Sequence, residues 1–291
     1  IEYCFNPATI PVRAHFCYLV VQRSNNLTWD CDTVGCVRLL VRLDADRDAA
    51  YDPEYHHKLR GVIWDYLRDT PFSELHSVDD AIPFSYSNPF PVGEIAEGDR
   101  RHVLVASPYD DLVRTLSDQI ETGDEFNIGE LPFTVADTST LTTDVGEPGT
   151  TGTLTTASGV YTPLKRDRWD EFDIEPEYEA SEIGWVPEYS LGLFRQRIRE
   201  NLAWKHRQIF RDYLKTPEEG GTLFEDWSRE KTYSVDVPVT EEYEWTFVVS
   251  KWTFGYRVRN DDHRRWLNLA LDAGLGARNT LGFGFVNDDK S

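Results

Sequence analysis

The chain has 291 residues, of which 40% are hydrophobic and 13% aromatic, and its formal net charge is -21. A chain with this much apolar surface can bury a core, so the composition excludes global disorder. No apolar run approaches the roughly eighteen residues that a membrane-spanning helix needs. We therefore expect one or two soluble domains that work without a membrane partner.

The acidic residues are spread along the whole chain rather than collected in one tail. One interpretation is an acidic surface that binds a specific partner. The other, which we favour, is adaptation to molar salt, where carboxylates keep a protein hydrated. Because the Debye length falls to about 3 Å at 1 M salt, the net charge then gives no argument against a nucleic acid partner.

The first thirty-six residues differ from the rest of the chain. They contain all four cysteines, and the whole sequence has no methionine. The cysteines, at Cys4, Cys17, Cys31 and Cys36, show no CxxC spacing that would indicate a zinc site. We interpret residues 1–36 as non-native translated sequence or as a weakly ordered extension. The cysteine-free body that follows fits a reducing cytoplasm.

The first half of the body, residues 37–145, predicts a ferredoxin-like domain. A helix over 53–70 has apolar residues at three- and four-residue spacing, and a helix over 107–124 has Ser107 as its expected N-cap. Alternating apolar residues and turn signals predict strands, which we place over 37–46, within 82–92, over 100–108 and within 125–141. This order, β-α-β-β-α-β, is that of the ferredoxin-like unit.

The second half, residues 146–291, repeats the order after the turn-rich stretch TTDVGEPGTTG. Helices are expected over 189–215 and 261–276, the second capped by an aspartate at its start and by Gly274 at its end. Strands are expected over 152–164, 231–240, 243–260 and 282–286. The sequence therefore predicts an α+β architecture of two tandem ferredoxin-like domains.

The stretch GLGARNTLGFGFV, between the last expected helix and strand, combines four glycines with one arginine. The residues concerned are Gly274, Gly276, Arg278, Gly282 and Gly284. Glycines let another backbone come close, and successive N–H groups with an arginine can hold phosphate oxygens. The alternative is a glycine helix cap followed by a tightly packed strand. The spacing alone leaves both interpretations open.

The pattern G-h-G-x-x-x-x-x-G-h-G, with a basic residue among the five, resembles the loop that closes the repeat-associated (RAMP) CRISPR proteins. The passages RLLVRLDADRDAAYDPEYHHKLRGVIWDYL and ELHSVDDAIPFSYSNPF resemble the branch of endoribonucleases that process precursor CRISPR RNA. The resemblance covers residues 37–286, and with the acidic composition it suggests a halophilic archaeon as the source.

The resemblance implies an endoribonuclease that cuts CRISPR repeat RNA without a metal or other cofactor and so produces guide RNAs. The ribose 2′-OH attacks the adjacent phosphate and leaves 2′,3′-cyclic phosphate and 5′-OH ends. The alternative is a non-catalytic RAMP subunit that binds guide RNA with other subunits of a CRISPR effector complex. A small-molecule enzyme of the acylphosphatase kind needs an Arg/Asn pair that we do not find.

The resemblance places the catalytic histidine at His76. Histidine suits this role because an imidazole is available in both protonation states near neutral pH. Two positions depart from the family. Trp64 stands where several members have tyrosine, and Ile82 where some have lysine. We therefore expect a histidine-centred site whose positive charge comes from Arg278, Lys58 or Arg60.

Residues 195–215 carry seven Lys or Arg against two acids, a local reversal in so acidic a chain. We expect phosphate contacts from this helix, through Arg195, Arg199, Lys205 and Arg207. The aromatic residues Trp245, Trp252, Phe254 and Tyr256 lie along one expected strand. We interpret them as core rather than as a base-stacking surface.

Overall fold

The computed structural model describes residues 36–51, 55–77, 84–175, 180–210, 223–240 and 243–289. The predicted extension over 1–36 lies outside these ranges except for Cys36, where the first strand begins. Its nature therefore stays a prediction. Within the described ranges, no helix combines the length and the apolar character that crossing a bilayer requires.

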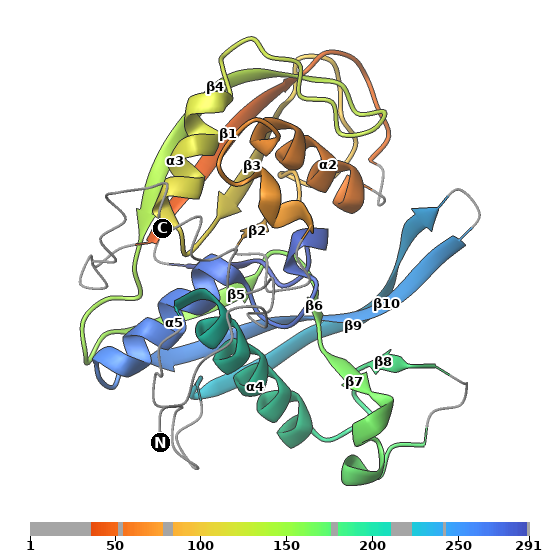
Figure 1. Ribbon diagram of the computed structural model, residues 1–291, viewed down its shortest axis with the longest axis vertical. Coiled ribbons are helices and arrows are strands. Elements are labelled where there is room, and N and C mark those ends of the chain that lie inside the picture. The colour runs from red at the N-terminus through yellow and green to blue at the C-terminus, as the bar shows by residue number, and fades with distance from the viewer. Residues whose placement is uncertain are drawn as a thin grey trace, which may run out of the picture. The chain divides into compact units, whose positions relative to one another are not determined.

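Four antiparallel strands form the first sheet, in the order β2-β3-β1-β4. Their bounds are Cys36–Ala45 for β1, Ser85–Tyr86 for β2, Arg100–Ala106 for β3 and Phe133–Thr143 for β4. Helix α2 (Tyr55–Leu67), followed by the short helix η2 (Ser73–Ser77), connects β1 to β2, and α3 (Asp110–Gln119) connects β3 to β4. Both long helices pack on one face of the sheet (Figure 1). This is the predicted ferredoxin-like arrangement.

The second sheet has the order β11-β5-β10-β6, and β9 pairs along the length of β10. The strands are β5 (Thr151–Thr156), β6 (Val160–Tyr161), β9 (Asp226–Thr240), β10 (Tyr243–Arg257) and β11 (Val286–Asp288). Helix α4 (Leu191–Phe210) precedes β9, and α5 (Asp261–Ala273) precedes β11. Because β5, β9, β10 and β11 repeat the strand order of the first sheet, the tandem ferredoxin-like prediction is confirmed.

Shorter elements fill the connections of the second half. Between β6 and α4 lie β7 (Pro163–Lys165), η3 (Arg166–Arg168), η4 (Asp170–Phe172) and β8 (Glu182–Gly184), and between α5 and β11 lies η5 (Asn279–Leu281). The long ribbon of β9 and β10 is plain in Figure 1. The predicted last strand over 282–286 is wrong in its start, because β11 begins only at Val286 and the glycines before it form a loop.

Each sheet buries one face against its own helices. In β1, Val41 and Leu43 are fully buried, as expected where every second residue of a strand faces the core. In α2, the buried side chains of Leu59, Ile63 and Leu67 recur every four residues and form the apolar stripe of the helix. Burying one such side chain contributes about 1.5–3 kcal/mol, so this face fixes the helix on the sheet.

The aromatic residues of β10 divide between two environments. Trp252, Phe254 and Tyr256 are buried with residues of α4 and α5, whereas Trp245 is 41% exposed. Trp245 lies an odd number of residues from the other three, so the alternation of the strand places it on the opposite face of β10, beside Phe247. The predicted burial is therefore confirmed for Trp252, Phe254 and Tyr256 and is wrong for Trp245.

Two predicted helix caps are wrong, and in both a neighbouring residue takes the position. Helix α3 begins after Tyr109, and the Ser107 Oγ accepts the N–H of Tyr109 (3.0 Å) instead of a helical N–H. The cap of α5 is Asn260, whose side chain accepts the N–H of His263 (2.8 Å). Asparagine and aspartate are equally good N-caps, so propensity does not distinguish Asn260 from the next residue. Gly274 is the C-cap of α5, as predicted.

Side chains of the first half reach the second half through β1. Arg38 is buried, and its guanidinium donates to the carbonyl oxygens of Leu271 and Val286 (both 2.8 Å) and to the Asn287 side chain (2.9 Å). The ring of Phe285 lies 4.9 Å from the guanidinium carbon. Residues 35–291 form one structural unit. The loop before β11 is therefore in contact with both halves.

Candidate functional site

The glycine loop, residues 274–284, owes its glycines to its own backbone. Gly274, Gly276, Gly282 and Gly284 all have positive φ angles, between 68° and 82°. A Cβ atom on Gly276 would overlap the carbonyl oxygen of Tyr161, and one on Gly284 would overlap a backbone oxygen of the loop itself. Tight packing therefore suffices to explain these glycines, and a bound phosphate is not needed to account for them.

The loop nevertheless presents donors that the protein does not use. Among the described residues, no acceptor faces the backbone N–H groups of Arg278, Asn279 or Thr280. Arg278 is in the left-handed region with φ 59°, which turns the chain at this point. The Asn279 side chain donates to the carbonyl oxygens of Leu275 (3.1 Å) and Phe283 (2.9 Å) and so closes the loop from inside. Successive free N–H groups of this kind suit an anion.

Lys205 supports the loop from behind. Its side chain is buried, and the ammonium donates to the carbonyl oxygens of Ala273 (3.1 Å) and Gly274 (2.7 Å), at the C-terminal end of α5. Burial lowers the pKa of Lys205 to about 7. The predicted phosphate contact of Lys205 is wrong, because its donors point into the protein.

Two elements of the first half of the chain, α2 and β2, also lie at the glycine loop. Both elements are in contact with η5 of the glycine loop. The Tyr86 hydroxyl, in the FSYS stretch, donates to the carbonyl oxygen of Thr280 (3.1 Å), and the Ser85 hydroxyl donates to that of Asp272 (3.0 Å). Burial raises the pKa of the Tyr86 phenol, and the nearby charge of Arg60 acts in the opposite direction. The structure thus brings predicted Arg60 close to the predicted loop.

Arg60 is half-buried, and its Nε is a buried atom without a hydrogen-bond partner among the described residues. Lys58, two residues earlier in α2, lies with its aliphatic stem against Gly129. Arg60 is therefore the better placed of the two for a ligand at the glycine loop.

His76 lies in η2, which packs against α2, and α2 in turn contacts the glycine loop. The side chains of His76, His56 and His57 fall outside what the structure describes. The catalytic role of His76 therefore stays a prediction. Trp64, at the position of the family tyrosine, is buried with its ring edge-on to Phe84 (centroids 5.3 Å apart). It serves the core, and Ile82 lies outside the described residues.

The remaining described histidines have structural partners. The buried ring of His263 accepts from the backbone N–H of Arg259, and burial lowers its pKa. The ring of His206 packs against Phe210 and Trp266, and that of His102 against Phe90. None of these three residues was predicted to be catalytic.

The basic helix α4 is only partly available to a ligand. Glu200 accepts from both Arg197 and Arg168, so these two cations are paired within the protein. Arg195 lies over the ring of Trp227 (5.2 Å) and Arg199 is half-buried, while Arg207 is exposed. Phosphate contacts by Arg195, Arg199 and Arg207 stay predictions.

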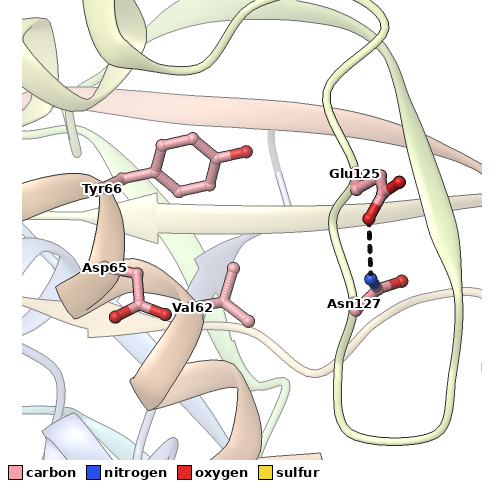
Figure 2. Close-up of a pocket in the computed structure, with 5 residues that line it drawn as sticks. All are labelled: Val62, Asp65, Tyr66, Glu125 and Asn127. Carbon is pink, nitrogen blue, oxygen red and sulfur yellow. Dashed lines mark hydrogen bonds between the residues drawn. The ribbon is translucent and has the colours of Figure 1, made fainter.

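A separate depression, with a volume of about 340 Å³, lies between α2 and the loop that leads to β4 (Figure 2). Its lining residues are Val62, Asp65, Tyr66, Glu125 and Asn127. None of them was predicted as a site residue. The carboxylates of Asp65 and Glu125 make this depression unsuitable for a phosphate, so the site is better placed at the glycine loop.

Known proteins match most of the chain. Residues 175–287 match the family model described as CRISPR associated protein Cas6, C-terminal. A protein of Haloferax mediterranei named CRISPR-associated endoribonuclease Cas6 is 46% identical over 252 residues, which are 86% of this chain and 93% of that protein. CRISPR-associated endoribonuclease Cas6 2 of Methanocaldococcus jannaschii is 25% identical over 259 residues, 87% of this chain and 100% of the relative.

Solved structures share the fold. One described as CRISPR associated protein Cas6 gives a TM-score of 0.63 at 15% identity, with 87% of this chain and 99% of that chain covered. The product of a Cas6-related gene from Pyrococcus furiosus gives a TM-score of 0.62 at 18% identity, with 88% and 100% covered. At these identities the similarity shows a shared fold only. This chain and the two solved structures have the tandem arrangement of sheets in common.

Proposed function

Because the chain belongs to the Cas6 family, we propose that it is an endoribonuclease that cuts CRISPR repeat RNA to generate guide RNAs. The observation that carries this proposal is the 46% identity, over most of both chains, to a protein named for that activity. The structure supports it with a loop that contacts elements of both halves and has N–H groups to which no described residue offers an acceptor.

The reaction we propose uses the RNA itself as the nucleophile. The ribose 2′-OH at the cleavage site attacks the adjacent phosphorus, and the bond from phosphorus to the 5′ oxygen of the next nucleotide breaks. The products are a 2′,3′-cyclic phosphate and a 5′-OH. This reaction needs a group that moves protons at the two oxygens and donors for the charge that builds on the phosphate.

We assign the proton transfer to His76 and the charge stabilisation to the glycine loop. Arg278 and the N–H groups of residues 278–280 are the donors on the loop side, and Arg60 approaches from α2. Trp64 cannot replace a tyrosine as a proton donor. We therefore expect a slow enzyme that relies mainly on His76.

Cleavage of a repeat-containing transcript in molar KCl, with analysis of the product ends, tests the proposal. We expect His76→Ala to slow cleavage by about 10²–10⁴-fold, the usual contribution of general acid–base catalysis, with RNA affinity nearly unchanged. His102→Ala is the matched control, because its ring packs against Phe90 and has no proposed role. Loss of cleavage on addition of EDTA would contradict the metal-independent mechanism.

The second candidate is a non-catalytic RAMP subunit that holds guide RNA in a CRISPR effector complex. The burial of Trp64 in the core favours it, because that position then supplies no titratable group. Repeat RNA that stays intact after long incubation with protein that binds it would establish this function instead.

We also propose a cellular location and the bounds of the two domains for this protein. The lack of cysteine after residue 36 fits the cytoplasm, where transcripts are available. We divide the body into domains over 37–145 and 146–291, with the boundary in the connection between β4 and β5. The predicted partners are the repeat RNA and subunits of an effector complex.

A further inference from the structure

Trp245, near the start of β10, is not explained by the roles assigned so far. Large hydrophobic side chains are exposed at four described positions, which are Val92, Leu141, Trp204 and Trp245. The Trp245 ring meets Phe247 edge-on, with centroids 6.1 Å apart and an interplanar angle of 70°. The indole is thus anchored along one edge while 41% of the residue stays exposed to solvent. Single exposed hydrophobic residues are common on protein surfaces, so the exposure of Trp245 points to a ligand only in combination with its neighbours.

The neighbour that gives this ring a chemical context is Arg278 of the glycine loop. Its guanidinium carbon lies 5.6 Å from the centre of the Trp245 ring, and its Nη2 lies 3.6 Å from the Glu182 carboxylate. Glu182 is itself fixed, because it accepts a hydrogen bond from the Tyr161 hydroxyl (3.0 Å). Arg278 is therefore held between a ring and a carboxylate, and 43% of its side chain remains exposed.

The backbone of Arg278 adds a second observation. Its φ of 59° is in the left-handed region, which costs a residue with a Cβ about 1–2 kcal/mol. Such a conformation persists only where the surrounding structure requires it, and it is found often at binding sites. The guanidinium of this residue lies beside Trp245, and the N–H groups of residues 278–280 have no acceptor among the described residues.

An indole and a guanidinium together recognise a flat, unpaired nucleobase with its phosphate. Bases of single-stranded RNA stack on aromatic rings and on arginine planes, and the attached phosphate suits nearby N–H donors. We propose that Trp245 and Arg278 form a stacking site for one unpaired nucleobase of the RNA, next to the glycine loop. This inference rests on the proposed RNA-processing function and adds to it a residue that fixes the path of the RNA.

A protein partner is the competing occupant of an exposed tryptophan. The surroundings favour RNA, because the group that lies over the ring is the guanidinium of Arg278, and no other exposed large hydrophobic residue is described in β10 or the glycine loop. The cation beside the ring belongs to the loop that we assign to phosphate. A protein-binding role would leave RNA affinity independent of Trp245.

The test compares Trp245→Ala with a matched control, Trp204→Ala, which removes an equally exposed tryptophan (39%) from α4. The probe is the repeat RNA with a 2′-deoxynucleotide at the cleavage position mapped on the wild type, so that it binds without being cut. In molar KCl we expect Trp245→Ala to weaken binding by about 5- to 150-fold and Trp245→Phe by no more than about threefold. Trp204→Ala should bind like the wild type.

Two further measurements separate stacking from a general loss of structure. The single-turnover cleavage rate of Trp245→Ala at saturating RNA should equal that of the wild type, because the residue positions RNA and does not react. In a series of RNAs with one abasic nucleotide each, one position should weaken wild-type binding without weakening Trp245→Ala further. Unchanged thermal melting of Trp245→Ala shows that the fold is intact.

The outcomes distinguish this inference from the proposed function. If the wild type cleaves repeat RNA and Trp245→Ala binds as tightly as Trp204→Ala, the stacking site is wrong while the nuclease stands. If all abasic positions weaken Trp245→Ala as they weaken the wild type, the inference is also overturned. If the wild type neither binds nor cleaves repeat RNA, the proposed function itself fails.

Discussion

Replacing Gly276 with alanine asks whether the glycine loop is shaped by its own packing or by a ligand. Gly276 has φ +69°, and a Cβ atom there overlaps the carbonyl oxygen of Tyr161. That oxygen accepts the N–H of Ala277 (2.8 Å), so it cannot move away without losing a hydrogen bond. The left-handed conformation costs about 1–2 kcal/mol and overpacking about 1–3 kcal/mol. We expect Gly276→Ala to lower the free energy of unfolding by about 3 kcal/mol.

Two other glycines separate these contributions. Gly98 has φ +80° and no described atom within 4 Å of an added Cβ, so Gly98→Ala should carry only the conformational cost, about 1 kcal/mol. Gly61 lies in α2, exposed and with nothing within 4 Å, and alanine there should raise the free energy of unfolding by about 0.5–1 kcal/mol. From the most stable to the least stable, the expected order is therefore Gly61→Ala, wild type, Gly98→Ala and Gly276→Ala.

Urea denaturation in molar KCl, followed by circular dichroism, gives the four free energies, and repeat-RNA binding by the folded variants gives their affinities. The packing argument is refuted if Gly276→Ala is as stable as Gly98→Ala and yet loses its RNA affinity. That result would mean that Gly276 serves to admit a phosphate rather than to close the loop.

Two further substitutions concern buried cations. Arg38→Lys should lower the free energy of unfolding by about 2–4 kcal/mol in urea denaturation, because one ammonium nitrogen on a shorter side chain replaces two guanidinium nitrogens, of which one bonds the carbonyls of Leu271 and Val286 and the other bonds Asn287. An effect no larger than that of Arg47→Lys, at an exposed position, would contradict this. The pKa of Lys205 is lowered to about 7, below its usual value near 10.4. Between these values the unfolded chain binds a proton that the folded protein does not, so this residue makes stability rise with pH from 7 to about 10. Lys205→Met should flatten that rise, by up to about 1.4 kcal/mol per pH unit, in denaturation curves measured across this range, and an unchanged slope would show that Lys205 is charged when folded.

The order of elements was predictable because it depends on local patterns. The apolar stripe of α2 and the alternation in β1 each depend on burial of one face, and both appear where the sequence placed them. The two sheets then follow from the β-α-β-β-α-β order. Caps and strand ends were less predictable, because adjacent polar residues such as Asn260 and Asp261 compete for one position.

Lys205 was misassigned although the sequence held a signal for its burial. Ile198, Leu202, Lys205 and Ile209 follow one another at spacings of four, three and four, which places the lysine on the apolar face of α4. The local excess of positive charge suggested a ligand, but helical phase was the stronger indicator. A lysine on a buried stripe indicates a buried acceptor, here the end of α5.

Strand alternation could have separated Trp245 from Trp252, Phe254 and Tyr256, because it lies an odd number of residues from them and therefore on the opposite face of β10. Its exposure could not be predicted, because Phe247 and Val249 on the same face of β10 are buried with Phe283 of the glycine loop, whereas Trp245 is not. Its nearness to Arg278 depends on contacts between segments more than thirty residues apart. The sequence identified Arg278 itself, but not the ring beside it.

The kind of ligand that the glycine loop can bind depends on which of its backbone groups already have hydrogen-bond partners in the protein. Lys205 donates to the carbonyl of Gly274, the Tyr86 hydroxyl to that of Thr280, and the Asn279 side chain to those of Leu275 and Phe283. These bonds use carbonyl oxygens, whereas the N–H groups of residues 278–280 have no acceptor in the described part of the chain. The groups of the loop that stay unpaired are therefore donors beside one arginine, so the loop selects a ligand rich in acceptors and negative charge, as the RNA backbone is.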